Sequence, residues 1–286
     1  MDTRAAFTVV PLSAVLGGKV LGIDLREAFD ADTAMALSNA FNERSVLCFP
    51  DQKIDADDQI RFASIFGRAD AEKGAKALGR DDVPKEVKRG VMFISNLRKD
   101  GRPIGDLPDG ELHFHSDGSH RPNPYLATTL FGIKVTSMGG ETKFANLAAA
   151  YDALPAGHKS QIDGLKARHV YDKRATKREH TDENDESLSS AVHDLVRIHP
   201  ETGRKSLYVS RLMTRNIIGM DRPKSDELLE MLCTHAERPE FVYAHPWKVG
   251  DLLIWDNRAV NHARNDFPSD QERHLRRVTV SDPSVR

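Results

Sequence analysis

The chain has 286 residues, of which 39% are hydrophobic and 29% charged, the composition of an ordinary globular protein. Its formal net charge of -2 excludes a broad basic surface for nucleic acid, and no apolar run approaches the roughly 20 residues of a membrane-spanning helix. Two cysteines are too few for a disulfide framework, and the start MDTRAAFTVVPL lacks the apolar core of a signal peptide, so we expect a cytoplasmic protein that binds neither nucleic acid nor membrane.

Three short strands are predicted at the start of the chain. They are Phe7–Leu12, Lys19–Leu25 and the apolar run Ser45–Phe49, which stops at Pro50.

Two helices are predicted in the same region. Asp32–Glu43 has helical spacing, with Asp32 as its N-cap. The apolar residues on or near one of its faces are Met35, Leu37 and Phe41. Asp55–Phe66 is acidic at its N-terminus, as the helix dipole favours.

Two charged stretches, residues 69–90 and 172–190, show no sustained apolar period. Solvated surface loops have this composition. Active-site lids also occur in long insertions of this kind, so the sequence leaves both interpretations open.

The rest of the chain is rich in short strands. We expect them at Val91–Ser95, Tyr125–Val135, Glu141–Ala145, Arg168–Tyr171, Ser206–Ser210, Phe241–His245, Asp251–Trp255 and Arg276–Ser281, with helices at Leu147–Leu154 and Ser225–Glu237. The strands do not alternate regularly with helices, which argues against a doubly wound parallel sheet and favours a sandwich or barrel. Without repeats or Gly/Ser linkers, residues 1–286 are predicted to form one domain.

The segment GELHFHSDGSH, residues 110–120, contains an H-x-D pattern. In a strand, side chains two residues apart point to one face, so His115 and Asp117 can aim an imidazole and a carboxylate at one point. A distant histidine would complete a facial triad for Fe(II), with open positions for a chelating cosubstrate and for O2.

Residues 250–280 supply such a histidine. An apolar strand and a polar bend precede His262, and a basic strand with Arg273, Arg276 and Arg277 follows. An arginine suits the far carboxylate of a dicarboxylate whose other end chelates iron, because its planar guanidinium pairs with carboxylate in a bidentate way.

The motifs HSDGSHRPNP, GGETKFANLAAAYDALP and THAERPEFVYAHPWKVGDLLIWDNRAVNHAR resemble the taurine and 2,4-dichlorophenoxyacetate dioxygenase family. The resemblance runs from Val10 to the C-terminus and includes Gly22–Glu27 and RSVLCFPDQ. It implies an α+β fold, mainly β with flanking helices, around a double-stranded β-helix (jelly-roll) core. It also implies a homo-oligomer, either a dimer or a tetramer.

The same resemblance implies an Fe(II)- and 2-oxoglutarate-dependent dioxygenase that consumes O2. Such an enzyme hydroxylates a C–H bond of a small, anionic organic substrate of the carboxylate, aryloxyalkanoate or sulfonate type, and it releases succinate and CO2. The residues that match the family's metal ligands are His115, Asp117 and His262. Thr142 and Arg273 match residues that hold 2-oxoglutarate, and Arg277 matches a second arginine near the cosubstrate or substrate.

Three further residues are candidates for contact with the substrate. Glu111 stands where the taurine enzyme has an asparagine, which argues against a simple taurine oxygenase. His199 resembles a histidine near the substrate in the phenoxyacetate enzymes, although a structural role is equally open. Lys73 lies in the first charged stretch, from which it could reach a substrate anion.

Other classes of protein compete with the Fe(II)-dependent dioxygenase as an interpretation of these residues. His113 and His115 form an H-x-H pattern typical of cupins, with His120 close behind, but Ser119 and His120 occupy the positions where a cupin needs glutamate. Iron dependence that survives His113→Ala but not Asp117→Ala would exclude the cupin set. A catalytically inactive binding relative is a second alternative. A serine hydrolase lacks its G-x-S-x-G elbow here.

Overall fold

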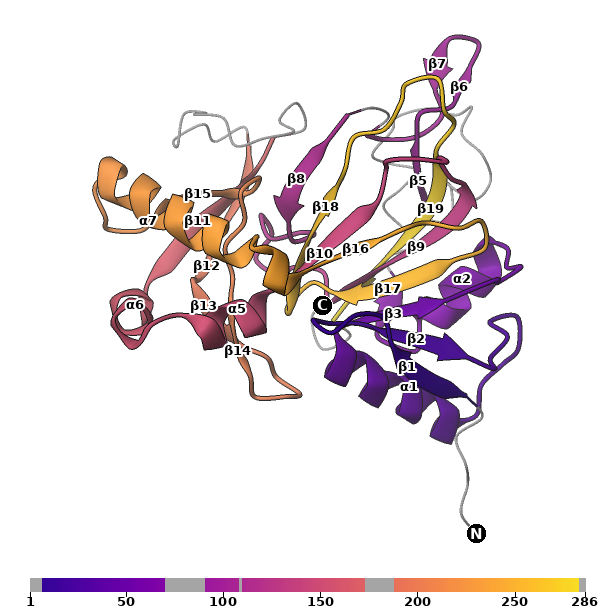
Figure 1. Ribbon diagram of the computed structural model, residues 1–286, viewed down its shortest axis with the longest axis horizontal. Helices are drawn as coiled ribbons and strands as arrows, with labels where there is room; N and C mark the ends of the chain where they lie inside the picture. Colours follow the sequence, from indigo (N-terminus) through magenta and orange to yellow (C-terminus); the bar gives the residue numbers. More distant parts are fainter. Residues whose placement is uncertain (1–6, 70–90, 108–109, 173–187, 283–286) are drawn as a thin grey trace.

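Two β-sheets occupy the centre of the molecule, and helices lie around them (Figure 1). The computed structural model describes residues 7–69, 91–107, 110–172 and 188–282. Within these ranges the chain is mainly β with flanking helices, which confirms the predicted class. None of the helices in this part of the chain is long and apolar enough to cross a membrane.

The first sheet has eight strands in the order β1-β2-β3-β17-β9-β19-β4, and β5 also pairs with β19. Its strands are β1 (Thr8–Pro11), β2 (Gly18–Leu21), β3 (Val46–Phe49), β4 (Arg68–Ala69), β5 (Met92–Ser95), β9 (Ala127–Lys134), β17 (Leu252–Asp256) and β19 (His274–Ser281).

The second sheet has four antiparallel strands in the order β16-β10-β18-β8. They are β8 (Leu112–His115), β10 (Thr142–Asn146), β16 (Val242–His245) and β18 (Val260–Arg264).

Smaller elements lie beside the two sheets. A three-stranded sheet contains β11 (Lys166–Tyr171), β12 (Ser189–Asp194) and β15 (Thr214–Ile217), and two ribbons pair β13 (Val196–Ile198) with β14 (Lys205–Leu207) and β6 (Arg98–Lys99) with β7 (Arg102–Pro103). The helices are α1 (Ala31–Arg44), α2 (Ala56–Ala63), α5 (Leu147–Ala153), α6 (Ala156–Ile162), α7 (Arg222–Ala236) and the 3-10 turn η1 (Pro239–Phe241).

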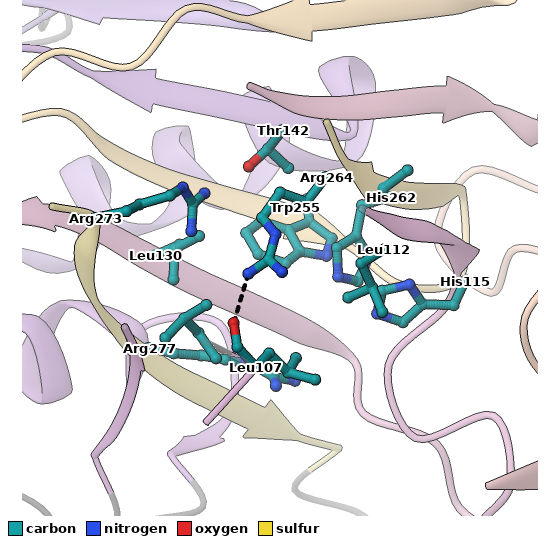
Figure 2. A pocket seen from close by; sticks show the side chains of 12 residues that line it. Leu107, Leu112, His115, Leu130, Thr142, Trp255, His262, Arg264, Arg273 and Arg277 are labelled. Atoms are coloured by element: carbon teal, nitrogen blue, oxygen red, sulfur yellow. Dashed lines mark hydrogen bonds between the residues drawn. The ribbon is translucent and has the colours of Figure 1, made fainter. Parts of the chain in front are cut away.

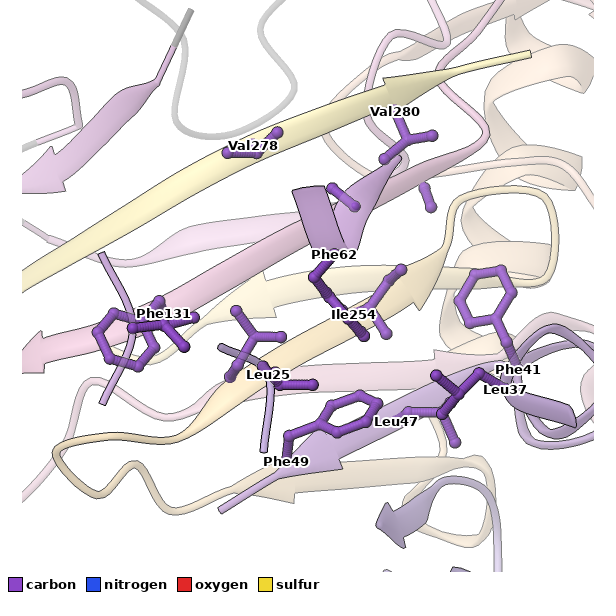
Figure 3. Close-up of a cluster of buried hydrophobic side chains, with 14 of the residues drawn as sticks. Leu25, Leu37, Phe41, Leu47, Phe49, Phe62, Phe131, Ile254, Val278 and Val280 are labelled. Carbon is purple, nitrogen blue, oxygen red and sulfur yellow. The ribbon is translucent and has the colours of Figure 1, made fainter. Parts of the chain in front are cut away.

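The central strands of the first sheet are buried on both faces, which explains the continuous apolar runs of β3 and β17. Leu47 and Phe49 of β3 pack with α1 and α2 in the cluster drawn in Figure 3. The alternate residues Val46 and Cys48 face the second sheet and pack in a cluster with Phe144 of β10. Burying a large apolar side chain contributes roughly 1.5–3 kcal/mol, so these two layers are the main source of stability for the sheets.

The start of α1 differs from the predicted one. Asp30, not Asp32, is the N-cap, and its side chain accepts a hydrogen bond from the Thr33 backbone N–H. Met35 is 61% exposed and points away from the core, whereas Leu37 and Phe41 are buried. A cap two residues earlier satisfies the first free N–H groups and leaves Asp32 in the first turn, where its charge suits the helix dipole.

Several strand limits also differ. β2 ends at Leu21, before Gly22 adopts a positive φ of 84°, so the predicted strand to Leu25 was too long. β8 and β18, which carry the candidate histidines, were not predicted as strands in their own right.

The two charged stretches lie largely outside the described residues. At their edges Ala69 belongs to β4, while Ser189 and Ser190 belong to β12, so these positions are not loop. The lid prediction for 69–90 and 172–190 otherwise falls on residues that the structure does not describe.

Candidate active site

Two histidines and one aspartate converge where β8 meets β18. His262 pairs with His115 across the two strands, and their ring centroids are 4.1 Å apart. The Asp117 carboxylate lies 3.7 Å from the Nε2 atom of each histidine, through Oδ1 for His115 and Oδ2 for His262. Two ligands at right angles, each about 2.1 Å from a metal, are about 3 Å apart, so small side-chain rotations would bring these donors onto one ion.

Asp117 is not on the strand, contrary to the prediction. β8 ends at His115, and Asp117 lies in the turn that follows. Contacts with two other elements hold it there. Thr128 of β9 donates to Asp117 Oδ2 (2.7 Å), and the Asp117 N–H donates to Asn257 Oδ1 (3.4 Å). Asn257 also accepts a hydrogen bond from Ser116 through its backbone carbonyl (2.7 Å), so the turn is tied to the end of β17.

The histidine rings are oriented in two different ways. His115 Nδ1 lies 2.9 Å from the His113 carbonyl, so Nδ1 carries the proton and Nε2 offers its lone pair to the centre. His262 is held by packing, because the Trp255 ring lies with its centroid 4.7 Å away. Both arrangements leave the Nε2 atoms facing Asp117.

Burial and charge act in opposite directions on these groups. Burial lowers the pKa of His115 and lowers that of His262 well below its usual value, so both imidazoles are neutral. Burial alone would raise the pKa of Asp117, but the Arg277 guanidinium, with the hydrogen bond from Thr128, outweighs it and the pKa falls. An ionised carboxylate with two neutral imidazoles is the protonation state that a divalent metal requires.

A cavity opens beside the two histidines. Its walls are formed by Ile94, Leu107, Leu112, His115, Leu130, Thr142, Trp255, His262, Ala263, Arg264, Arg273 and Arg277. Figure 2 shows the His115 and His262 rings on one side of this cavity and the Arg273 guanidinium on the other. A short dicarboxylate would therefore find metal donors at one end and a cation at the other.

Arg273 is a buried cation whose charge has no carboxylate partner in the described part of the chain. It is 3% exposed, and its Nε donates to the Gly140 carbonyl (3.3 Å). Burial, with Arg264 nearby, lowers its pKa to about 9. A buried cation without a counter-ion is costly, so this geometry favours an anionic ligand.

Arg277 occupies a different place from Arg273. Its Nη2 atom lies 2.8 Å from Asp117 Oδ1, next to the metal donors. Arg276, the third arginine of this strand, points away from the cavity and donates to Gln59 Oε1 (2.7 Å) and to the carbonyls of Ile54 and Asp55.

Glu111 and His199 are not among the residues that line the cavity. The Glu111 side chain is 57% exposed, 4.0 Å from the His113 ring. His199 is buried; its Nε2 contacts Asp256 Oδ2 (2.9 Å), and its Nδ1 accepts from the Thr202 N–H (3.2 Å). Both ring nitrogens of His199 are thus used in contacts within the protein, which favours the structural role of the two left open; a substrate contact of His199 stays a prediction. Lys73 lies outside the described residues.

Three residues of the site were missed from the sequence. Thr128 and Asn257 hold Asp117, and Trp247 donates its indole N–H to Thr142 Oγ1 (3.0 Å). The WDN triplet within the quoted motif was a signal for Asn257. No spacing pattern in the sequence marks Thr128 or Trp247, because only folding brings them into contact with Asp117 and Thr142.

The cupin set is not assembled in the described residues. His113 and His120 belong to neither group of side chains that could hold an ion. A second such group, Cys48, His245 and Asp251, is buried, but His245 Nε2 already donates to Asp251 Oδ2 (3.0 Å). Burial raises the pKa of Cys48 to about 12, which opposes the thiolate that a metal needs, so we assign this group a structural role.

Comparison with known proteins gives consistent matches along the chain. Residues 8–279 match the model of the family described as taurine catabolism dioxygenase TauD, TfdA family. The chain is 34% identical to an (S)-phenoxypropionate/alpha-ketoglutarate-dioxygenase of Sphingobium herbicidovorans, over 94% of this chain and 92% of that protein. It is 33% identical to the alpha-ketoglutarate-dependent 2,4-dichlorophenoxyacetate dioxygenase of Cupriavidus pinatubonensis, over 96% of this chain and 98% of that protein.

A solved structure is similar over nearly the whole chain. The crystal structure of AAD-2 in complex with Mn(II) and N-oxalylglycine has a TM-score of 0.79 and 34% identity, and the match covers 96% of this chain and 97% of that one.

Proposed function

Because this chain belongs to the taurine catabolism dioxygenase TauD, TfdA family, it is a 2-oxoglutarate-dependent dioxygenase, and we propose that it hydroxylates a C–H bond of a small organic anion. The observation that carries the proposal is one cavity with the His115–Asp117–His262 cluster on one side and the buried cation of Arg273 on the other.

His115, Asp117 and His262 would hold Fe(II). The donor set fits, since two neutral imidazoles and one carboxylate are the facial triad of non-haem Fe(II) oxygenases. When bound with 2-oxoglutarate and O2, the iron supplies an oxidant that replaces a C–H hydrogen by hydroxyl, with succinate and CO2 as co-products. The hydrogen bond from Thr128 and the contact with Asn257 hold the carboxylate in place for this ligand set.

Arg273 and Thr142 would bind the distal carboxylate of 2-oxoglutarate. Both line the cavity, and both are at most 3% exposed. A guanidinium and a hydroxyl can donate to the two oxygens of one carboxylate, and a charge-assisted pair is strong in a desolvated site. Their place across the cavity from the histidines would orient the 2-oxo acid end toward the metal donors.

The substrate would be an anion with an apolar body. Arg277 supplies a cation beside the triad, and three leucines, Leu107, Leu112 and Leu130, contribute apolar wall. An apolar wall also excludes water from the reacting centre. Relatives named for phenoxypropionate and dichlorophenoxyacetate support an aryloxyalkanoate-like substrate over taurine, which has no apolar body. Lys73 remains a predicted additional contact.

The finer fold assignment is also part of the proposal. The orders β5-β19-β9-β17 and β8-β18-β10-β16, with the chain crossing between the sheets, support a double-stranded β-helix in a single domain. The homo-oligomer and the cytoplasmic compartment remain predictions.

A succinate-release assay tests the function. Fe(II)-loaded protein with 2-oxoglutarate and O2 would be screened against aryloxyalkanoates, alkyl sulfates, sulfonates and simple carboxylates. We expect substrate-dependent succinate release with amphiphilic anions and little with taurine. His262→Ala should abolish the release. Full Fe(II)-dependent activity in that variant would refute the ligand assignment, and activity with neutral analogues alone would refute the anionic substrate.

A further inference from the structure

Trp247 lies behind Thr142, in the turn after β16. Its indole N–H donates to Thr142 Oγ1 at 3.0 Å. We propose that Trp247 is a positioning residue for the cosubstrate: it occupies the acceptor side of the Thr142 hydroxyl and so directs the hydroxyl proton into the cavity, toward the carboxylate beside Arg273. This inference rests on the proposed function.

The chemistry of the two groups sets the direction of the hydrogen bond. An indole N–H can only donate, so Thr142 must be the acceptor. A hydroxyl has one proton, and in the described part of the chain no protein acceptor for the Thr142 proton is found. Thr142 is 3% exposed and lines the cavity. Its one remaining donor is therefore available to a ligand there.

Trp247 is itself held on two sides. Its ring meets that of His245 edge-on, with centroids 4.9 Å apart, and His245 pairs with Thr142 across β10 and β16. On its other side, the N–H of Lys248 donates to Asp251 Oδ2 (3.0 Å), the same oxygen that accepts from His245 Nε2 (3.0 Å). The Asp251 carboxylate thus fixes His245, whose ring contacts the indole, and Lys248, which follows Trp247 in the chain.

The proton order in this network is set by Asp251, because a carboxylate oxygen can only accept from its histidine partner. His245 therefore donates from Nε2 to Asp251 Oδ2 (3.0 Å). Its Nδ1 then accepts from the Tyr243 hydroxyl (3.0 Å), which keeps its proton because burial raises the pKa of Tyr243 to about 12. The network has a donor and an acceptor at each step, so the ring that supports Trp247 has one stable orientation.

Backbone contacts bring the turn close to β9. Gly132 accepts from the Gly250 N–H (2.9 Å) and donates to the Asp251 carbonyl (2.9 Å). A Cβ atom at Gly132 would lie 3.0 Å from the Lys248 carbonyl oxygen and 3.4 Å from the Trp247 ring. A side chain at this position would press on the Lys248 backbone next to the tryptophan, so the glycine suits this close approach.

A double-mutant cycle with Trp247→Phe and Thr142→Val tests the role. The phenylalanine keeps an aromatic ring but loses the N–H, and the valine keeps the shape but loses the hydroxyl. Affinity for 2-oxoglutarate would be measured by titration calorimetry on Mn(II)-loaded protein, which does not turn over. We expect roughly 10-fold weaker binding in Thr142→Val, roughly 3–10-fold in Trp247→Phe, and no further loss in the double variant. Independent effects that multiply in the double variant would overturn the proposal.

A second probe separates positioning from general damage to the fold. 2-Oxobutyrate has the same 2-oxo acid end but no distal carboxylate, so its binding should be equal in wild type and Trp247→Phe, as should Mn(II) affinity. Equal losses for 2-oxobutyrate and 2-oxoglutarate would show that Trp247 only packs. If wild-type protein bound no 2-oxoglutarate, the proposed function would fail and the inference with it. Normal wild-type binding with an unchanged Trp247→Phe variant would overturn the inference alone.

Discussion

Asp117 is buried but keeps its charge because Thr128 donates to one oxygen and Arg277 lies beside the other. The Thr128 hydrogen bond contributes to lowering the carboxylate pKa. In Thr128→Val that donor is lost, so the ionised carboxylate is less stable and less well oriented. We predict roughly 3–10-fold weaker Mn(II) binding, measured by calorimetry.

Thr129 provides a matched control for this variant. It is the next residue of β9, is equally buried, and donates to the Val278 carbonyl (3.2 Å), away from the cavity. Thr129→Val should lower the free energy of unfolding but keep metal affinity. If both valine variants bound Mn(II) equally well, Thr128 would have no part in orienting Asp117.

Arg273 is expected to dominate cosubstrate affinity. Removing it leaves a buried carboxylate unpaired, a loss of about 3–5 kcal/mol. Arg273→Ala should therefore raise the 2-oxoglutarate concentration for half-maximal activity by roughly two to three orders of magnitude, and Thr142→Val should have a smaller effect. A larger effect from Arg277→Gln than from Arg273→Ala would assign the distal carboxylate to Arg277 instead.

Single residues with a strong chemical signature could be predicted from the sequence. His115, Asp117 and His262 meet in space, and Arg273 and Thr142 line the same cavity. Supporting residues such as Thr128 and Trp247 could not be predicted, because threonine and tryptophan are common core residues without a fixed spacing to the site. His199 was ambiguous because its partner, Asp256, is distant in the sequence.

At the scale of elements, the start of α2 provides a stability test. Asp55 accepts from the Asp58 N–H (2.9 Å), and the Asp58 side chain accepts from the Asp55 N–H (3.1 Å), which is a reciprocal capping box. Asp55→Ala should lower the free energy of unfolding by about 1 kcal/mol, read from the urea midpoint at unchanged slope. Asp57→Ala, in the same turn but outside the capping box, should lower the free energy of unfolding by only a few tenths of a kcal/mol. Equal losses of stability in the two variants would mean that negative charge at the N-terminus of α2, and not the capping box, stabilises the helix.

β8 and β18 show why some elements escaped prediction. Every residue of β18 is buried although three of its five side chains are polar: Asn261, His262 and Arg264. Such a strand has neither the alternation of a half-buried strand nor the apolar run of a fully buried one. Its polar groups are satisfied by distant partners, for example Arg264 by the Gly110 carbonyl. Strands with one conventional pattern, such as β3 and β17, were predicted within a residue or two.

For the whole molecule, buried neutral histidines predict sensitivity to acid. Burial lowers the pKa of His169 from 6.5 to about 3 and that of His120 to about 4. In the unfolded chain both would titrate near 6.5, so the unfolded state takes up protons first as the pH falls. The free energy of unfolding should therefore decrease from about pH 6.5 downward, by up to about 1.4 kcal/mol per pH unit for each histidine.

His169→Asn tests this pH dependence, because asparagine does not titrate and can keep the contact near Thr214. The variant should be less stable at pH 7, but its stability should fall less steeply between pH 6.5 and 4, as followed by urea unfolding at a series of pH values. If the free energy of unfolding fell with pH equally steeply in wild type and variant, His169 would be protonated without cost in the folded state.

The places of β17, β18 and β19 in their sheets have a consequence for biosynthesis. Each of these late strands lies between strands made earlier: β17 between β3 and β9, β18 between β10 and β8, and β19 between β9 and β4. During translation neither sheet can close until this last part of the chain has left the ribosome. His262 and Arg273 emerge in the same interval, so the nascent chain acquires its third metal donor and its dicarboxylate cation long after His115 and Asp117. A chain interrupted before these strands would consequently expose unpaired strand edges, which quality-control proteases and chaperones recognise, and it would lack the third metal donor.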